Sequence, residues 1–302
     1  MKTECEAGGL KLSNPTILAA GIMGTTGASL KRMASMGAGA VVTKSIGVQP
    51  KYGHPNPTMV VLQGGYVNAM GLPNPSYKEF TRELEIARES HVPVIASIFG
   101  ATAEEFVEIA RGLPGADAYE LNVSCPHAIG YGMQVGTDPA LVKSITAAVK
   151  AAVKVPVWVK LTPNVTDIRE IGLAAQEGGA DAVVAINTLK AMAIDVDTGY
   201  PILGNVHGGL SGPAIKPVAV RCVYDLYDAL EIPVIGAGGV SNWADAVEMM
   251  MAGACAVEIG SAVYEDTGVF AATAMGVSDY LDRKGLKLKD IVGMSHKKKV
   301  KA

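Results

Sequence analysis

A cysteine among polar neighbours is the first residue of this sequence that could do chemistry. Cys125 lies in the run 120–127, after an apolar strand-like stretch, and the following residues include Gly130, Gly132 and Gly136. A cysteine at a strand end, followed by a glycine-hinged flap, indicates acid or base chemistry under a lid. Taken alone, the run fits a buried, inert thiol equally well.

Polar side chains also occur at the ends of other apolar runs. They are Lys44, Ser45, Ser97, Asn122, Lys160, Asn187 and Thr188. Lysines and asparagines are costly to bury without an anionic or polar ligand. Strand alternation places Lys160 on the same face as Trp158, which argues against an outward lysine paired with a helix carboxylate. Asn68 is either a site residue or an ordinary turn asparagine.

Three glycine clusters indicate a phosphate-binding end. They occupy 208–212, in a loop after the predicted sixth strand, 236–239 and 260–261. Bare backbone amides bind phosphate well, and the loops after strands seven and eight of a barrel often do so. Glycines also form ordinary turns, but three clusters at one end favour a phosphate-bearing cofactor or substrate.

The elements that must position these residues form a repeating pattern. Eight short apolar runs alternate with stretches of helix length: 17–21, 40–45, 93–99, 118–125, 156–162, 182–188, 233–238 and 256–261. This order predicts an α/β fold, a (β/α)8 TIM barrel, as a single domain over 1–302. A doubly wound open sheet is the alternative.

Capping residues predict where several helices begin and end. Helices are expected to start after Thr102, Asp138, Asp167 and Asn242. Glycines that accept left-handed backbone angles are expected to close them at Gly112, Gly178–Gly179 and Gly253.

Composition excludes several classes of function. The 302 residues are 49% apolar and 18% charged, and 26 basic against 29 acidic residues give a net charge of −3. This favours a globular enzyme over a protein that binds nucleic acid or a membrane. The four cysteines, Cys5, Cys125, Cys222 and Cys255, include no CxxC pair, so no metal and no iron–sulfur cluster is expected in this chain. Reduced thiols and a cytoplasmic location are the default expectation.

Taken together, these motifs resemble the dihydroorotate dehydrogenase family. The resemblance is carried by 122–126 (Asn-Val-Ser-Cys-Pro), 68–74, the pair Asn187–Thr188, 208–217, Gly238–Gly239 and Gly260–Ser261, and it runs from about Gly9 to Ala262. The likeness is greatest to the catalytic subunit of the NAD-linked, two-subunit class.

The resemblance implies that FMN is bound in the barrel mouth. It implies that the phosphate is held by Gly212, Gly238, Gly239, Gly260 and Ser261, and that the ring is contacted by Ala20, Gly21, Lys44, Ser45, Ser97, Asn122, Lys160 and Ile186. A positive charge at Lys160 would stabilise the anion formed on reduction.

The resemblance also implies a substrate and a mechanism. Dihydroorotate would be bound by Lys44, Asn68, Ala69, Met70, Gly71, Leu72, Asn122, Asn187 and Thr188. Cys125 would take the C5 proton while C6 delivers hydride to the flavin, with Lys160 and Lys44 as the other catalytic residues, to give orotate for pyrimidine synthesis.

Three positions depart from the family pattern. His127 and Ser97 stand where an asparagine is frequent, and Ala20 stands where a serine is frequent. These changes put individual substrate or FMN contacts in doubt without removing a catalytic group.

Two other functions remain open at this stage. The sister family, dihydropyrimidine dehydrogenase, reduces uracil and thymine, but its acidic residue after the substrate asparagine is absent from 69–71. A non-catalytic flavin-binding scaffold has no reason to retain Cys125 with Lys44 and Lys160. The resemblance further implies a partner subunit with FAD and a [2Fe–2S] cluster, around a homodimer core of a heterotetramer.

Overall fold

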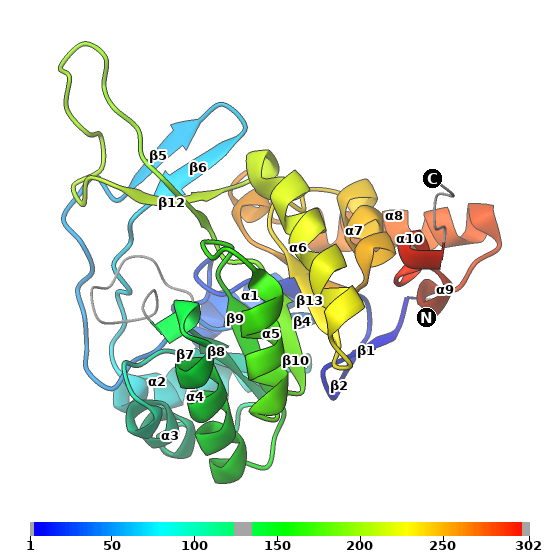
Figure 1. The fold of residues 1–302 in the computed structure, drawn as a ribbon, viewed down its shortest axis with the longest axis horizontal. Helices are drawn as coiled ribbons and strands as arrows, with labels where there is room; N and C mark the ends of the chain where they lie inside the picture. Colours follow the sequence, from blue (N-terminus) through cyan, green and yellow to red (C-terminus); the bar gives the residue numbers. More distant parts are fainter. Residues whose placement is uncertain (1–2, 124–134, 298–302) are drawn as a thin grey trace.

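Parallel strands form a closed barrel at the centre of the molecule (Figure 1). In the computed structural model, which describes residues 3–123 and 135–297, the last barrel strand pairs with the first. The barrel strands in chain order are β3 (Thr16–Leu18), β4 (Ala40–Val42), β7 (Val94–Ile98), β8 (Ala118–Asn122), β9 (Val157–Leu161), β10 (Ala182–Ala185), β13 (Val234–Ala237) and β14 (Ala254–Ile259). The predicted (β/α)8 barrel is confirmed, and each predicted run overlaps one of these strands; β3 and β14 begin one and two residues before the predicted runs 17–21 and 256–261.

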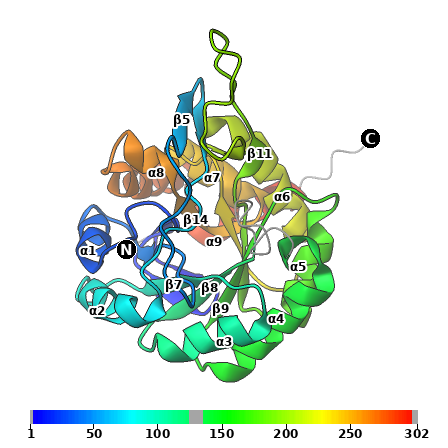
Figure 2. The same cartoon turned by 90° about the vertical axis from the view of Figure 1, so that its left-hand side faces the viewer.

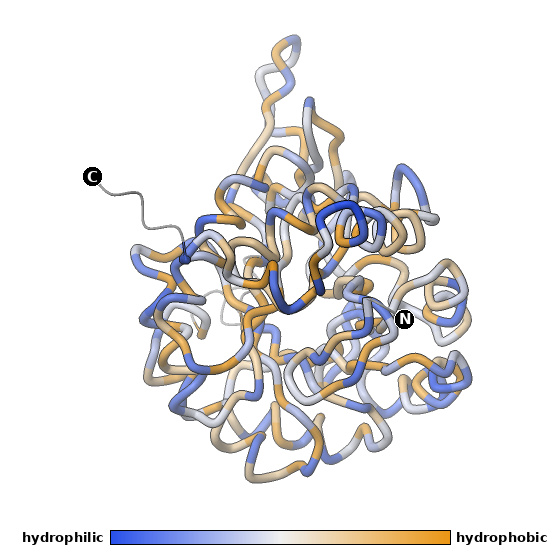
Figure 3. The backbone as a smooth tube through the Cα atoms, turned by 90° about the vertical axis from the view of Figure 1, so that its right-hand side faces the viewer, coloured by the Kyte–Doolittle hydropathy of each residue, from blue (hydrophilic) through white to orange (hydrophobic). Residues whose placement is uncertain are grey.

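Helices form a ring outside the barrel (Figure 2). The ring comprises α1 (Gly27–Ser35), α2 (Tyr77–Arg88), α3 (Ala103–Gly112), α4 (Pro139–Ala152), α5 (Ile168–Glu177), α6 (Lys216–Ala229), α7 (Trp243–Ala252) and α8 (Val269–Lys284). Two short helices, α9 (Leu288–Ile291) and α10 (Met294–Lys297), follow. Hydrophilic and hydrophobic residues alternate along the outer helices (Figure 3), as expected for helices that bury one face.

The predicted helix starts are confirmed. Side chains of Thr102, Asp138, Asp167 and Asn242 accept backbone hydrogen bonds from the first turns of α3, α4, α5 and α7. Gly253 closes α7 with a φ of 131°. The prediction for Gly112 is wrong, because this glycine is the last residue of α3 and has no positive φ. The absence of a side chain at Gly112 makes room for Tyr77, whose Cε2 would lie 2.2 Å from a Cβ at residue 112.

Apolar side chains fill the amino-terminal half of the barrel. Trp158 is fully buried there with Ile17, Ile95 and Ile235. The hairpin of β1 (Cys5–Ala7) and β2 (Leu10–Leu12) adds Ala7, Leu10 and Leu12 to this cluster. The Trp158 indole donates a hydrogen bond of 2.9 Å to the carbonyl of Gly8. This end of the barrel is therefore a packed core, and the polar residues lie toward the other end.

A second sheet, which the sequence did not predict, lies at the carboxyl ends of the barrel strands. It contains β11 (Leu189–Ala191), β12 (Gly208–Ser211), β6 (Gly65–Asn68) and β5 (Met59–Leu62) in that spatial order. It projects to one side of the barrel (Figure 1). The prediction that 208–212 is a loop is wrong for 208–211, because β12 pairs with β6. Asn68 ends β6 and is not a turn residue.

Candidate active site

A cavity opens at the carboxyl ends of the barrel strands, against the second sheet. Its volume is about 1170 Å³ with its open mouth included. The predicted site residues that line it are Ala20, Gly21, Lys44, Ser45, Asn68, Met70, Gly71, Leu72, Asn122, Lys160, Ile186, Asn187, Thr188, Gly212, Gly238, Gly239, Gly260 and Ser261.

Two predicted residues that the structure describes, Ser97 and Ala69, are not among those that line the cavity. Ser97 is fully buried behind Ser45, and Ala69 is fully buried with Val67 in a small apolar cluster under the second sheet. Cys125 lies outside the described residues, as does His127. Ser97 therefore supports Ser45 from behind and is not placed for the direct FMN contact predicted for it.

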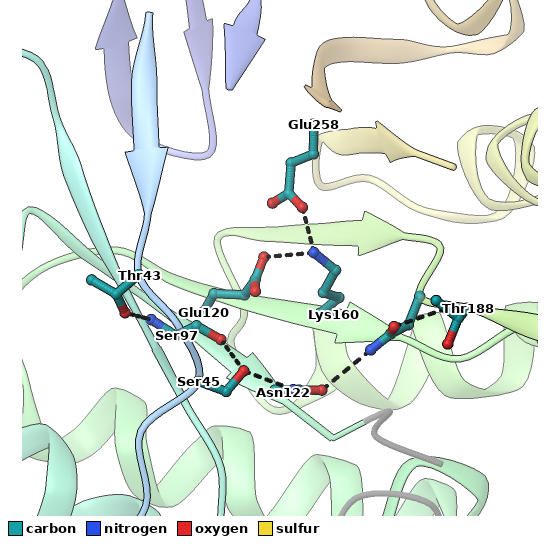
Figure 4. A network of polar contacts seen from close by, with 9 residues as sticks. Thr43, Ser45, Ser97, Glu120, Asn122, Lys160, Thr188 and Glu258 are labelled. Carbon is teal, nitrogen blue, oxygen red and sulfur yellow. Dashed lines mark hydrogen bonds and ion pairs between the residues drawn. The ribbon is translucent and has the colours of Figure 1, made fainter. Parts of the chain in front are cut away.

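A hydrogen-bonded chain of side chains crosses the barrel mouth (Figure 4). Asn122 Nδ2 donates to Ser45 Oγ at 2.9 Å, and Ser45 Oγ is 2.9 Å from Ser97 Oγ. Asn187 Nδ2 donates to Asn122 Oδ1 at 3.4 Å, while Asn187 Oδ1 accepts the backbone N–H of Thr188 at 2.8 Å. These bonds fix which way both amides point, so their remaining donors and acceptors are oriented before a ligand binds.

The glycine-rich end of the cavity has backbone angles that favour glycine. The φ values of Gly212, Gly238 and Gly239 are 97°, 116° and 77°. A Cβ at Gly239 would lie 2.6 Å from the Cβ of Lys216. Side chains are therefore excluded here by conformation and by space, which leaves exposed amides suited to an anion.

An ionic network holds two of the glycine turns together. Asp245 is 8% exposed and accepts hydrogen bonds from Lys216 Nζ at 2.7 Å and from the backbone N–H of Ser241 at 2.9 Å. Lys216 begins α6, just after the turn at Gly212, and Ser241 follows the turn at Gly239. The sequence analysis missed Asp245 because its partner is distant in the chain.

A buried lysine lines the cavity beyond the ends of β3 and β4. Lys44 is 8% exposed, and its Nζ lies 3.9 Å from the position of a Cβ at Gly21. Gly71 and Leu72 line the same cavity with φ values of 76° and 57°. A Cβ at Gly71 would lie 2.5 Å from the backbone nitrogen of His54, so this position requires glycine.

Three charged side chains meet at the cavity floor. Lys160 Nζ forms a very short ion pair with Glu258 and lies 3.5 Å from Glu120 Oε2 (Figure 4). Burial and the proximity of Glu258 raise the pKa of Glu120 well above its usual range. Burial lowers the pKa of Lys160, but Glu120 and Glu258 outweigh it and raise that pKa overall. The sequence analysis missed both carboxylates, although alternation from Asn122 and Gly260 places them on the inward face.

Two tyrosines form the wall of the cavity near the second sheet. The Tyr66 and Tyr264 rings lie 5.4 Å apart, and the Tyr66 hydroxyl donates a very short hydrogen bond to Glu265. This bond raises the pKa of Tyr66, and burial raises that of Tyr264. The sequence analysis missed this wall, because Tyr66 and Glu265 are 199 residues apart.

Two searches of residues 3–123 and 135–297 gave negative results. No group of three or more His, Cys, Asp or Glu side chains is arranged to hold a metal ion there. No helix in these ranges has the length and apolar character needed to cross a membrane.

Comparison with known proteins identifies the family. Residues 2–281 match the family model described as dihydroorotate dehydrogenase. The chain belongs to the dihydroorotate dehydrogenase family. A relative from Methanocella arvoryzae is 79% identical over 98% of this chain and 99% of its own length. Relatives from Methanosarcina mazei and Pyrococcus horikoshii are 66% and 52% identical, over 95% and 96% of this chain and 93% and 96% of their own lengths. All three are named dihydroorotate dehydrogenase B (NAD(+)), catalytic subunit.

Membership of this family makes the chain an oxidoreductase with FMN as its cofactor. The cavity fits that cofactor on its own geometry. The turns at Gly212, Gly238 and Gly239 place backbone without side chains along the cavity, which suits a phosphate group, and Lys160 adds a buried cation to its lining. These residues therefore fit the anionic part of FMN.

Proposed function

We propose that the chain is the catalytic subunit of a dihydroorotate dehydrogenase that oxidises dihydroorotate to orotate in pyrimidine biosynthesis. One observation carries the proposal: a single cavity is lined by the glycine turns at 212 and 238–239, by Lys44 and by three asparagines. FMN, when bound, accepts the hydride from C6 of the substrate. A cytoplasmic location and a single domain over 1–302 remain predictions from the sequence.

The chain's own residues bind and orient the substrate and move its proton. Asn68, Asn122 and Asn187 line the cavity and offer amide donors and acceptors to the pyrimidine ring. Lys44 supplies a charge for the carboxylate, and Gly71 and Leu72 contribute backbone amides. Cys125 takes the C5 proton as general base, and positioning above the cofactor supplies much of the rate.

We expect dihydroorotate to bleach the yellow, FMN-loaded chain under anaerobic conditions, and dihydrouracil to do so far less efficiently. A charge-assisted hydrogen bond to the carboxylate contributes about 1.5–3 kcal/mol, or about 10- to 100-fold. The kcat/KM for dihydrouracil should therefore be at least about tenfold lower. The measurement is the rate of loss of flavin absorbance with each substrate.

Lys44→Met is the variant that tests this assignment. The ratio of the two kcat/KM values should collapse toward one, and any effect of Lys44 on the flavin cancels in that ratio. Gly71→Glu is unsuitable, since a side chain there meets His54 at 2.5 Å. If dihydrouracil is the better substrate of the wild-type chain, a dihydropyrimidine dehydrogenase-like activity replaces the proposed one.

We also propose a second subunit that carries FAD and a [2Fe–2S] cluster and passes electrons to NAD, around a homodimer of this chain. The support is the name of the relatives, which designates them catalytic subunits of an NAD(+) enzyme. The described cysteines, Cys5, Cys222 and Cys255, are separate free thiols whose pKa burial raises to between about 11 and about 12. Such protonated thiols are poor cluster ligands.

We therefore expect the purified chain alone to reduce NAD at a negligible rate with dihydroorotate as donor, while its flavin is still bleached. Adding the second subunit should restore NADH formation, followed by absorbance. Rapid NAD reduction by the lone chain contradicts the two-subunit proposal but leaves the dihydroorotate activity intact.

A further inference from the structure

The floor of the cavity contains an uneven set of buried charges. The side chains of Glu120 and Glu258 are fully buried, and that of Lys160 is 7% exposed. Lys160 and Glu258 line the cavity, whereas Glu120 lies behind them. Two carboxylates and one ammonium carry a net charge of −1 if all are ionised. A buried carboxylate without a full partner takes up a proton instead, because desolvation penalises its charged form.

The two carboxylates are not equivalent. Glu258 Oε2 accepts a hydrogen bond from Lys160 Nζ, while Glu120 is 3.5 Å away from that nitrogen. Among the described residues, the donors near Glu120 are the Lys160 ammonium, at 3.5 Å, and the Ser97 hydroxyl, but neither makes a hydrogen bond of full geometry with it, and Glu258 Oε1 has no partner. A proton on Glu120 removes its charge and provides a donor that Glu258 can accept.

We propose that Glu258 is the ionised counter-ion that positions the Lys160 ammonium against the cofactor, and that Glu120 is a protonated acid that keeps the buried trio neutral. Glu258 is thus a positioning residue that acts through Lys160. The inference rests on the proposed function only for the identity of the ligand above Lys160.

The surroundings of the trio are consistent with this charge state. Burial, together with Glu258, raises the pKa of Glu120 well above its usual range. The strand neighbours are uncharged: Ser97 and Trp158 lie beside Glu120, and Ala237 and Ile17 lie beside Glu258. The position of Lys160 therefore determines which of the two carboxylates is ionised.

Infrared spectroscopy of the FMN-loaded chain tests the charge state directly. A protonated glutamic acid has a carbonyl band that ionised carboxylates lack, and 13C-labelled glutamate distinguishes this band from those of the flavin. We expect the band at neutral pH in the wild type and in Glu170→Gln, an exposed control. Glu120→Gln should lack it. Glu258→Gln should lack it too, because Glu120 then ionises and becomes the counter-ion of Lys160.

Titration of the unloaded chain with FMN tests the positioning role. Glu120→Gln copies the protonated acid and should leave the Kd within about twofold of the wild type. Glu258→Gln lets the ammonium move toward Glu120 and should raise the Kd about tenfold, the effect of a lost charge-assisted contact.

Three results overturn the proposal. They are no acid band in the wild type, a band that survives in Glu120→Gln, and an equal or larger loss of FMN affinity in Glu120→Gln than in Glu258→Gln. If Glu258→Gln does not fold, the wild type and Glu120→Gln still decide the charge state. Neither measurement uses dihydroorotate. A failure of the proposal on the buried trio is therefore distinct from a failure of the dihydroorotate bleaching test.

Discussion

Cys125→Ala should abolish dihydroorotate oxidation while FMN stays bound. A positioned general base contributes about 10²- to 10⁴-fold, so we expect at least a ~10³-fold loss in the rate of flavin bleaching. Among the described residues that line the cavity, four ionisable side chains are poor replacements. The pKa values of Lys160, Tyr66 and Tyr264 are all raised, and Glu258 is bound to Lys160. The measurement is stopped-flow absorbance with excess dihydroorotate.

Two further variants serve as controls for Cys125. Cys125→Ser should retain a trace of activity that increases toward high pH, because a hydroxyl is a much weaker base than a thiol at neutral pH. Cys222→Ala removes a thiol on α6, whose pKa burial raises to about 11, and should leave the rate unchanged. Full activity in Cys125→Ala means that another residue is the base.

Lys160→Met should cause the largest loss of stability of any single change at the site. Removing one partner of a buried ion pair costs about 3–5 kcal/mol, because the remaining charge is left buried without compensation. Lys160 is the cation for both Glu258 and Glu120. The free energy of unfolding, measured by denaturant titration of the unloaded chain, should fall by that amount near neutral pH.

The pH dependence of this loss has a definite sign. Lys160 lowers the pKa of Glu120, which burial raises. Without the ammonium, the pKa of Glu120 therefore rises further above its unfolded value, and the folded state binds more protons. The contribution of this carboxyl to the stability of Lys160→Met is then fully present below the unfolded pKa of a glutamate, about 4.3, and is lost as the pH rises through the raised folded pKa. The defect of Lys160→Met should therefore be smaller at pH 5 than at pH 8.

Lys143→Met is the matched control for Lys160→Met. Lys143 pairs with Glu177 at 2.8 Å, but both side chains are more than half exposed. Exposed pairs contribute about 0–1 kcal/mol, so this variant should be nearly as stable as the wild type. Equal effects of the two substitutions contradict the assignment of Lys160 to a buried ionic cluster.

Local patterns in the sequence were sufficient to predict the barrel and most of the residues that line the cavity. Each apolar run overlaps one barrel strand, because a strand buried on both faces has a continuous apolar sequence. Asp138 and Asn242 cap helices through bonds to residues two and three positions later, which a sequence pattern expresses directly. The strand ends are less accurate: β10 ends at Ala185, so Asn187 and Thr188 lie in the following loop.

The second sheet depended on the tertiary structure. Asn68 and Gly209 are 141 residues apart, and their strands pair only because the barrel brings both segments to the same rim. A local sequence pattern does not show whether residues 208–211 form a loop or a strand that pairs with β6. The placement of Ser97 behind Ser45 is of the same kind, because side-chain depth depends on neighbouring strands.

By itself, the sequence determined the (β/α)8 order, the helix caps, the glycine-rich end of the cavity and the motifs of the dihydroorotate dehydrogenase family. These features depend on residues close in the chain, whose spacing reflects backbone geometry and side-chain alternation. Only the tertiary structure decided the partners of Lys160, since Glu258 is 98 residues away. The charge state of a buried ionic cluster depends on which groups share the same low-dielectric space, and that is a property of the folded chain.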